Sequence, residues 1–478
     1  MSNLFTITTC FRLATPVLFV VLLMLGGCAS LPEDVQRKPS YVIEDTSGTK
    51  LGRDIKPLLA KHPGKSGFHA LGPGTDAFAA RALLVERAEK TLDVQYYIWH
   101  DDLTGKVLHN RILHAADRGV RVRLLLDDLD TAGKDEILNI LDAHPNIEVR
   151  LFNPFANRNN RVGDFVADAG RMNHRMHNKS ITADNQATIF GGRNIGDEYF
   201  DAAEVVGFTD LDVLAIGPVV SEVSQAFDLY WNSQWVYPLA AFYKDKQIDE
   251  SQIKAFRQES DAFIKEASTT EYAAALRALE IVKQKSVVRL DYSWGKWYLV
   301  YDQPSKVEAE KIKKETHLAP ALKDGMDRTK SELIIVSPYF VPGSRFTNYL
   351  VSLVEKGVRV RILTNSLAAN DVPLVHAGYM RYREDLLRGG VELYEYKAIK
   401  GVSKEKQKAK WSGSSRASLH GKFLSFDRQY MFVGSFNLDG RSVALNTELG
   451  VFFESPKYAR MMANGFDQKA MTKAYKLI

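Results

Sequence analysis

The sequence has little cysteine, little net charge and no long apolar run. Its 478 residues include only Cys10 and Cys28, and no cysteine–histidine cluster has the spacing of a zinc site. The formal net charge of +5 is small for this length, so charge alone does not support nucleic-acid binding. The N-terminal apolar run, residues 17–25, is well under the ~18 residues that a membrane-spanning helix needs. These absences exclude a disulfide scaffold, a zinc-cluster protein and an obvious integral membrane protein.

The overall composition is that of a well-cored globular protein. Hydrophobic residues make up 45% of the chain and charged residues 25%, so disorder is not expected. The length predicts more than one domain.

The N-terminus has the features of an export signal. Arg12 is the only charge before the apolar run, which ends in two glycines and Cys28. We expect residues 1–27 to be a signal peptide, with an uncleaved anchor as the alternative. The segment resembles a bacterial lipobox, in which Cys28 would be lipidated and become the mature N-terminus.

Lipidation would tie the protein to a membrane. Residues 28–67 are polar and interrupted by proline and glycine, which favours a tether between lipid and fold. Ala29 stands where an aspartate would resemble an inner-membrane retention signal. We therefore expect a lipid-anchored protein of the bacterial cell envelope, on the periplasmic side, at the outer membrane if the source is Gram-negative.

A succession of strand, helix and strand occurs twice. In the first part we predict helices over residues 77–90 and 105–117, and strands over 92–99 and 120–126. In the second part the corresponding strands are 333–341 and 358–363, with a helix over 348–355. This order is typical of α/β units with parallel strands.

The two parts also echo one another in sequence. Residues 118–123 (RGVRVR) correspond to residues 356–361 (KGVRVR), which indicates an internal duplication. The predicted fold class is α/β: two similar half-domains with mixed, largely parallel sheets sandwiched by helices, packed as a pseudo-dimer. We place the half-domains at residues 68–242 and 318–478, joined by a charged, helical connector over residues 243–317.

One spaced motif occurs once in each half-domain. Its members are a histidine, a lysine two residues on, an aspartate five residues after the lysine, and an asparagine that one residue separates from a preceding pair of small residues. In the first half these are His177, Lys179, Asp184 and Asn194, and in the second His420, Lys422, Asp427 and Asn437. The spacing is identical in both copies, which makes a chance match very rare.

The residue types suit a phosphodiester. A histidine and a lysine two apart on a strand point to the same face, so an imidazole and an ammonium would lie side by side. Two facing copies would gather two imidazoles, two ammoniums and two amides around the non-bridging oxygens of one phosphoryl group.

The paired motifs resemble those of the phospholipase D superfamily. The segments DAFAARALL, LDVQYYIWHDD, RMHNKS, GGRNIGDEYF and NSLAANDVPLVHAGY are most similar to type C bacterial cardiolipin synthases and related phospholipase D-like lipoproteins. The resemblance implies a two-step reaction without metal or cofactor, through a covalent phosphohistidine that an alcohol or water then resolves.

Roles follow from matching positions. The resemblance makes His177 the nucleophile and His420 the general acid, or the reverse, and makes both lysines and both asparagines ligands of the phosphoryl oxygens. A carboxylate should hold the second ring nitrogen of each histidine. Glu448 matches that position in the second half, and Asp210 is the best match in the first, with Asp212 as competitor. Gly192 stands where the second copy has Ser435.

Other polar groups allow weaker interpretations. A metal or headgroup contact at Asp127, Asp128 and Asp130 is conceivable, although acidic strand ends are commonly solvated. Basic residues before each catalytic histidine could funnel an anionic headgroup or belong to surface loops: Arg158, Arg161, Arg171, Arg175, Lys404, Lys406, Lys408, Lys410 and Arg416. We expect Tyr96, Tyr97 and Trp99 to be core residues, and His109, His114, His174 and His376 to be structural or at the surface.

The function that fits best is phosphatidyl transfer or hydrolysis on membrane glycerophospholipids, with an alcohol or water as acceptor and no nucleic-acid partner. The alternatives are a metal-independent nuclease of the same superfamily and a non-catalytic phospholipid-binding lipoprotein. The sequence does not choose between water and alcohol, because that depends on pocket shape and water exclusion.

Overall fold

The computed structural model describes residues 30–203, 207–243, 248–308, 312–398, 418–468 and 470–478. The predicted signal peptide, Cys28 and the lysine-rich run before His420 lie outside these residues. In the described part of the chain, no helix is long and apolar enough to cross a membrane.

Each half of the described chain is built on one mixed sheet. The first sheet has nine strands in the order β10 (Ser293–Gly295), β1 (Ser66–Leu71), β8 (Asp212–Ile216), β6 (Ala187–Gly191), β5 (Ser180–Ala183), β2 (Thr91–Tyr96), β3 (Arg121–Asp127), β4 (Ile147–Phe152), β9 (Val236–Pro238). The second has eight, in the order β11 (Trp297–Tyr301), β18 (Leu449–Glu454), β17 (Tyr430–Gly434), β16 (Phe423–Phe426), β12 (Glu332–Val336), β13 (Arg359–Asn365), β14 (Glu392–Tyr396), β19 (Ala474–Lys476).

The two strand orders correspond from β8–β6–β5–β2–β3–β4–β9 to β18–β17–β16–β12–β13–β14–β19. The duplication seen in the sequence is therefore a duplication of the fold, and the predicted class of paired α/β half-domains is confirmed. Parallel pairing occurs within β2–β3–β4 and within β12–β13–β14, where the strand–helix–strand units lie. The neighbours outside each trio pair antiparallel.

Helices cover both faces of each sheet, which explains why strands such as β2 are buried along their whole length. In the first half these helices are α3 (Gly74–Arg87), α4 (Leu103–Asp117), α5 (Asp135–Asp142) and α8 (Val219–Trp231). In the second they are α12 (Leu318–Asp327), α13 (Gly343–Glu355), α14 (Pro373–Arg388), α16 (Pro456–Gln468) and the short α17 (Ala470–Lys473).

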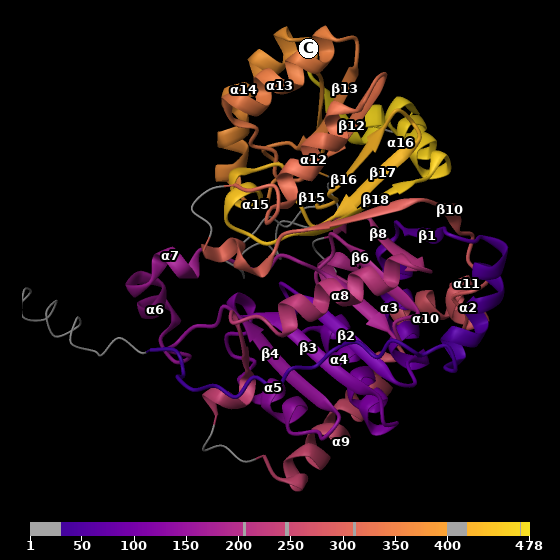
Figure 1. Cartoon of the computed structure of the whole chain (residues 1–478), viewed down its shortest axis with the longest axis vertical. Coiled ribbons are helices and arrows are strands. Elements are labelled where there is room, and N and C mark those ends of the chain that lie inside the picture. The colour runs from indigo at the N-terminus through magenta and orange to yellow at the C-terminus, as the bar shows by residue number, and fades with distance from the viewer. Residues whose placement is uncertain (1–29, 204–206, 244–247, 309–311, 399–417, 469) are drawn as a thin grey trace, which may run out of the picture.

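The halves pack through a shared apolar core. Figure 1 shows them as two lobes, one above the other, with β6 and β8 of the lower lobe facing β17 and β18 of the upper. Phe68 stacks on Phe453 with ring centroids 4.4 Å apart, and Met431 and Val451 are buried in the same cluster. The contact is a continuous hydrophobic core, so the halves are fixed relative to each other.

The connector joins both sheets. It begins with α9 (Glu250–Ala267), α10 (Glu271–Ala278) and α11 (Glu280–Gln284), which lie against the first half. The chain then adds β10 to the edge of the first sheet and β11 to the edge of the second, so the link crosses directly from one lobe to the other (Figure 1).

The tether predicted over residues 28–67 is wrong where the chain folds against the first half. Residues 50–61 form helix α2 (Lys50–Lys61), which buries Leu51 and Ile55 in the first core. Upstream, the Arg37 side chain donates to the carbonyl of Val236 over 2.8 Å. The segment is polar in composition but amphipathic once helical, and that apolar stripe holds it against the fold.

Candidate active site

The paired motifs converge where the two lobes meet. His177 and Lys179 lie directly before β5, and His420 and Lys422 lie between β15 (Ser418–Leu419) and β16. The prediction that each pair lies within a strand is therefore wrong. Their side chains are nevertheless all buried, with the histidines 6% and the lysines 1% exposed.

Each histidine is held by a carboxylate from the opposite half. His177 Nδ1 lies 2.8 Å from Glu448 Oε2, and His420 Nδ1 lies 2.7 Å from Asp210 Oδ2. Because Nδ1 is engaged, the Nε2 atom is the one directed to a reacting group.

The backbone repeats the same exchange. The His177 N–H donates to the carbonyl of Thr447, and the His420 N–H donates to the carbonyl of Thr209, each over 2.8 Å. Strand β15 also pairs in parallel with β7 (Phe208–Thr209) of the first half. Each histidine is therefore held twice by the opposite half: its backbone bonds a threonine, and its ring bonds the carboxylate of the next residue.

Asp210, rather than its competitor Asp212, is placed at the histidine. The Asp212 carboxylate is taken by two buried arginines, Arg81 at 2.8 Å and Arg193 at 3.3 Å. Gly192 follows from the same packing, since a Cβ atom there would lie 2.5 Å from Asp210 Oδ1.

The second half uses hydroxyl groups instead. The Ser435 hydroxyl donates to Glu448 Oε2 over 2.5 Å, and the Ser442 hydroxyl donates to Glu448 Oε1 over 2.7 Å. The two carboxylates are thus supported differently, and the halves are not chemically equivalent.

The four basic groups share one electrostatic environment. Burial lowers the pKa of His177 to about 4, against the opposing effect of Glu448. Burial and the ammonium of Lys422 lower the pKa of His420, and burial also lowers the pKa of both lysines. The ammonium of Lys422 also lowers the pKa of His177 and of Lys179, so it lies near the pair of the first half. A phosphoryl group would supply the negative charge that favours the charged lysines.

The carboxylates remain ionised. Burial alone would raise the pKa of Asp210, but the hydrogen bond with His420 and the positive charges of His420, Lys422 and Arg193 together outweigh it, and the net shift is downward. The pKa of Glu448 is lowered as well: burial opposes this, and the charge of His177 favours it. An ionised carboxylate fixes the tautomer of its histidine and stabilises the imidazolium that forms during proton transfer.

The asparagines also lie in the site. Asn194 donates to the hydroxyl of Tyr199 over 2.9 Å, and the Asn437 backbone N–H donates to Ser442. Their buried side-chain oxygens have no hydrogen-bond partner among the described residues. Each free oxygen can therefore accept a hydrogen bond, for example from a hydroxyl group, but it cannot donate one to a phosphoryl oxygen.

Two tyrosines were missed or misplaced by sequence reasoning. Tyr97, expected in the core, packs edge-on against His177 at 5.0 Å between ring centroids, with the Lys179 ammonium 5.4 Å from its ring. Tyr199 packs the same way on His420 at 5.1 Å. The neighbours Tyr96 and Trp99 are core residues, as expected. Tyr96 is the last residue of β2 and Tyr97 follows it, so one position in the chain decides whether the ring lies in the core or at His177.

Asp184 and Asp427 are not brought to the site. Asp184 lies at the far end of β5, where its carboxylate accepts the backbone N–H groups of residues 89–91. Asp427 does the same for residues 330–332. Both turn residues have positive φ, 52° and 51°. The aspartate of each motif therefore fastens a turn to the neighbouring strand.

A buried ion pair in the connector supports Glu448, and no sequence pattern indicated it. Asp302 Oδ2 accepts the Glu448 backbone N–H over 2.8 Å and lies 2.9 Å from Lys306 Nζ. Lys306 also donates to the carbonyl of Ser442 over 2.8 Å. Both side chains are fully buried. The connector thus helps to place the carboxylate that holds His177.

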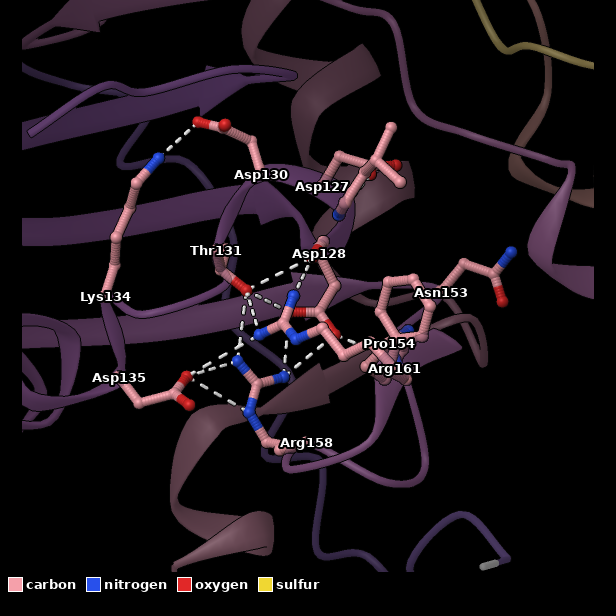
Figure 2. A network of polar contacts seen from close by, with 12 residues as sticks. Asp127, Asp128, Asp130, Thr131, Lys134, Asp135, Asn153, Pro154, Arg158 and Arg161 are labelled. Carbon is pink, nitrogen blue, oxygen red and sulfur yellow. Dashed lines mark hydrogen bonds and ion pairs between the residues drawn. The ribbon is translucent and has the colours of Figure 1, made fainter. Parts of the chain in front are cut away.

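The acidic strand end is a structural network. Figure 2 shows Arg158 and Arg161 converging on Asp128, Thr131 and Asp135. Arg158 Nη1 lies 2.8 Å from both oxygens of Asp128. Arginine side chains therefore occupy the Asp128 carboxylate, where a metal or headgroup contact was conceivable. Because Arg158 and Arg161 are paired in this way, they are not free to attract an anionic headgroup.

The same network leads into the catalytic loop. Asp127 accepts the Met176 backbone N–H over 2.7 Å and lies 3.3 Å from Arg175. Asp130 pairs with Lys134. The loop before His177 is thereby fixed to the carboxyl end of β3.

The remaining histidines differ from one another. His109 stacks on Trp99 in the core, His114 lies at the surface near Asp261, and His376 is buried with Nδ1 near the carbonyl of Asn365. Half-buried His174 bonds the carbonyl of Leu445, and so links the two halves.

The described residues include one group with metal-ligand geometry. His100, Asp102 and Glu198 have ligand atoms within 4.8 Å of one another. Asp102 is already occupied as the N-cap of α4 and by the backbone N–H of Asp197.

Comparison with known proteins decides the family. The family model described as "Cardiolipin synthase, PLD-like domain" matches residues 83–231 and 322–470, once in each half. The chain is 45% identical over 428 residues to cardiolipin synthase C of Escherichia coli (strain K12), covering 90% of both chains. The chain belongs to the cardiolipin synthase family with phospholipase D-like domains.

More distant relatives agree. The chain is 32% identical over 448 residues to an uncharacterised protein of Helicobacter pylori (strain ATCC 700392 / 26695), covering 93% of this chain and 87% of that one. The structure resembles phosphatidylserine synthase of Haemophilus influenzae Rd KW20 with a TM-score of 0.57 at 16% identity, covering 90% and 92% of the two chains. The predicted family and enzyme class, a phospholipase D-like enzyme acting on phospholipids, are confirmed. The non-catalytic lipoprotein is not favoured.

We predict that Asp184→Ala lowers stability without removing catalysis. The substitution leaves three strand-edge N–H groups without their charged acceptor, which should cost about 3 kcal/mol of unfolding free energy. Chemical denaturation measures the loss, and turnover per folded molecule should stay near wild type. Glu384→Ala, at an exposed pair 2.6 Å from Arg388, is the control and should change stability by less than about 0.5 kcal/mol. Loss of turnover in folded Asp184→Ala would contradict the structural role.

We predict that the Asp302–Lys306 pair is coupled. Lys306→Met leaves a buried carboxylate unpaired and should destabilise the fold by about 3–5 kcal/mol. The double variant Asp302→Asn/Lys306→Met removes both charges and should recover a large part of that loss in a double-mutant cycle. Equal stability of the single and double variants would contradict the pairing.

We predict a low acid limit for the reaction. Attack needs neutral His177, which predominates above its pKa, so the acid-side decline of kcat/KM should lie near pH 4. The first step also needs protonated His420, whose pKa is lowered by burial and Lys422, so kcat/KM should fall again on the alkaline side as that proton is lost. A free histidine would already lose activity below about 6.5. Glu448→Gln should lower kcat by about 10²–10⁴-fold, whereas Glu280→Gln at the surface should not. If the kcat/KM of the wild type instead declined around pH 6.5 as the pH is lowered, this would argue against His177 as the neutral nucleophile.

Proposed function

We propose that this enzyme is a cardiolipin synthase that transfers a phosphatidyl group between glycerophospholipids through a phosphohistidine on His177. The observation that carries the proposal is the crossed arrangement of two histidines, each held at Nδ1 by a carboxylate of the other half. It supplies one imidazole for attack and a second for proton transfer at the same phosphorus.

In the first step, His177 Nε2 attacks the phosphorus of the donor phospholipid. The bond from phosphorus to the leaving headgroup oxygen breaks, and protonated His420 gives its proton to that oxygen. Lys179 and Lys422 bind the non-bridging oxygens, where negative charge must be stabilised in the transition state.

In the second step, the hydroxyl of an acceptor lipid enters. His420, now neutral, removes the hydroxyl proton while the oxygen attacks phosphorus, and the bond to His177 breaks. The product is a new phosphodiester, and both histidines return to their starting state. Transfer rather than hydrolysis is supported by the burial of the site, which limits water, and by the relative named cardiolipin synthase C.

We further propose that Cys28 anchors the enzyme to the envelope membrane, as its sequence context favours. A lipid anchor would confine enzyme and substrate to two dimensions. Mass spectrometry of the N-terminal peptide from membrane-purified protein tests this, and an unmodified, uncleaved N-terminus would refute it.

We predict that His177→Ala abolishes lipid conversion. Purified enzyme is mixed with phosphatidylglycerol, alone or with phosphatidylethanolamine, and the products are read by lipid mass spectrometry. Cardiolipin indicates transfer, and phosphatidic acid indicates hydrolysis. The variant should be at least about 10⁴-fold slower, as for loss of other covalent nucleophiles, while the surface variant His114→Ala stays active.

The intermediate itself can be trapped. Quenching at neutral or alkaline pH, followed by peptide mass spectrometry, should place a phosphatidyl adduct on His177, because phosphohistidine is lost in acid. An adduct on His420 instead would reverse the two roles. Cleavage of plasmid DNA in EDTA without lipid conversion would favour the nuclease alternative.

A further inference from the structure

Two segments that are linked to the catalytic loops expose large apolar side chains, one from each half. In the first half, α6 (Arg161–Ala167) leaves Val162 77% and Val166 75% exposed. In the second, the turn into α14 leaves Leu367 57% and Leu374 83% exposed. We call these four residues the apolar rim.

Helix α6 is inverted relative to a helix that faces water. Its polar residues turn inward: Asp164 is buried and accepts the Ala156 backbone N–H over 2.7 Å, and Arg161 donates to the carbonyl of Asp128 over 2.6 Å. Its two valines point outward. A helix at an aqueous surface shows the opposite arrangement.

The second segment is inverted in the same way. Asn370 and His376 are buried, and the backbone N–H of Val372 donates to the Asn370 side chain over 2.9 Å. Leu367 and Leu374, on either side of Asn370, are exposed. Two unrelated stretches of sequence, at the carboxyl-end edges of corresponding strand trios, thus share one unusual feature.

Both segments are fastened to the catalytic loops. After α6 comes α7 (Ala169–Met172), and the next residue, Asn173, accepts two bonds from Arg441 of α15 (Gly440–Ala444) in the other half. Figure 1 shows α6 and α7 projecting from the body of the molecule, below α15.

On the other side of the site, the Asn365 side chain bonds both backbone groups of Leu419, the neighbour of His420. Two residues after Asn365 comes Leu367 of the rim. Tyr339, which precedes the bridge between Phe340 and Leu438, donates to Asp371 over 2.6 Å. The rim residues therefore lie close in sequence to residues that bond the loops carrying the two histidines.

We propose that the apolar rim inserts into the surface of a phospholipid bilayer and so presents the site to the headgroups. Exposed apolar side chains above buried polar ones are favourable when the medium outside is itself apolar, as at the boundary between headgroups and acyl chains. The inference rests on the proposed function, because a phospholipid substrate brings that surface to the mouth of this site.

The bilayer explains the rim better than a second protein does. The reacting phosphodiester lies at the depth of the headgroups, so side chains beside the site must reach the boundary below them. A second copy of the chain or another protein on the rim would cover the mouth that the lipid has to enter.

The test compares one substrate in two physical states. Full-length Val166→Asp/Leu374→Asp is assayed on vesicles of phosphatidylglycerol and phosphatidylethanolamine, and on short-chain phosphatidylglycerol kept dissolved as monomers. We expect a loss of about tenfold or more on vesicles, because charges replace two apolar side chains that would lie in the bilayer. On dissolved lipid, which needs no surface, activity should stay within about twofold of wild type.

The control is Leu229→Asp/Met461→Asp, which changes one exposed apolar residue of each half away from the rim, 45% and 60% exposed. It should match wild type on both substrates. The milder Val166→Ser/Leu374→Ser should show a smaller loss of the same kind if the aspartates disturb folding.

The outcomes separate the two proposals. Equal activity of the rim variant and wild type on vesicles would overturn the proposed insertion of the rim into the bilayer. An equal loss on vesicles and on dissolved lipid would do the same. A change from oligomer to monomer in the rim variant, seen by light scattering, would assign the rim to a second copy instead. Inactivity of the wild type on both substrates would refute the proposed function, independently of the rim.

Discussion

The active site depends on two hydrogen bonds that cross between the halves. Glu448 holds His177 and Asp210 holds His420, so neither half contains a histidine together with its own carboxylate. A half-domain alone would present a buried imidazole and lysine without the charge that orients them. Docking of the halves is therefore part of the chemistry, and the stacked Phe68 and Phe453 help to maintain it.

The site concentrates charge that is costly to bury. Two lysines, two histidines and two carboxylates are all buried, and pairing offsets only part of the cost, as the lowered pKa of each lysine shows. The surrounding structure holds these groups in place through the Asp302–Lys306 pair and the network around Asp128. An unfavourable burial of charge is typical of active sites, which stabilise the charge that develops in a transition state rather than the fold.

Much of this could be predicted from local pattern. The duplication was visible in the repeated RGVRVR and KGVRVR segments, and the motif spacing identified both histidines and both lysines. The three helices and four strands predicted from the pattern all overlap observed elements. Prediction failed where a residue's environment is set by distant contacts: Tyr97 was expected in the core, and residues 50–61 were expected in a tether.

The sequence by itself determined the fold class, the twofold repeat and the chemical groups of the site, because periodicity and motif spacing are properties of short segments. Only the tertiary structure decided which carboxylate serves which histidine, since those partners lie 271 and 210 residues apart in the chain. It also assigned the motif aspartates to turns and turned the valines of α6 outward. Side-chain partners across such separations are fixed by the packing of two whole half-domains, which no local pattern contains.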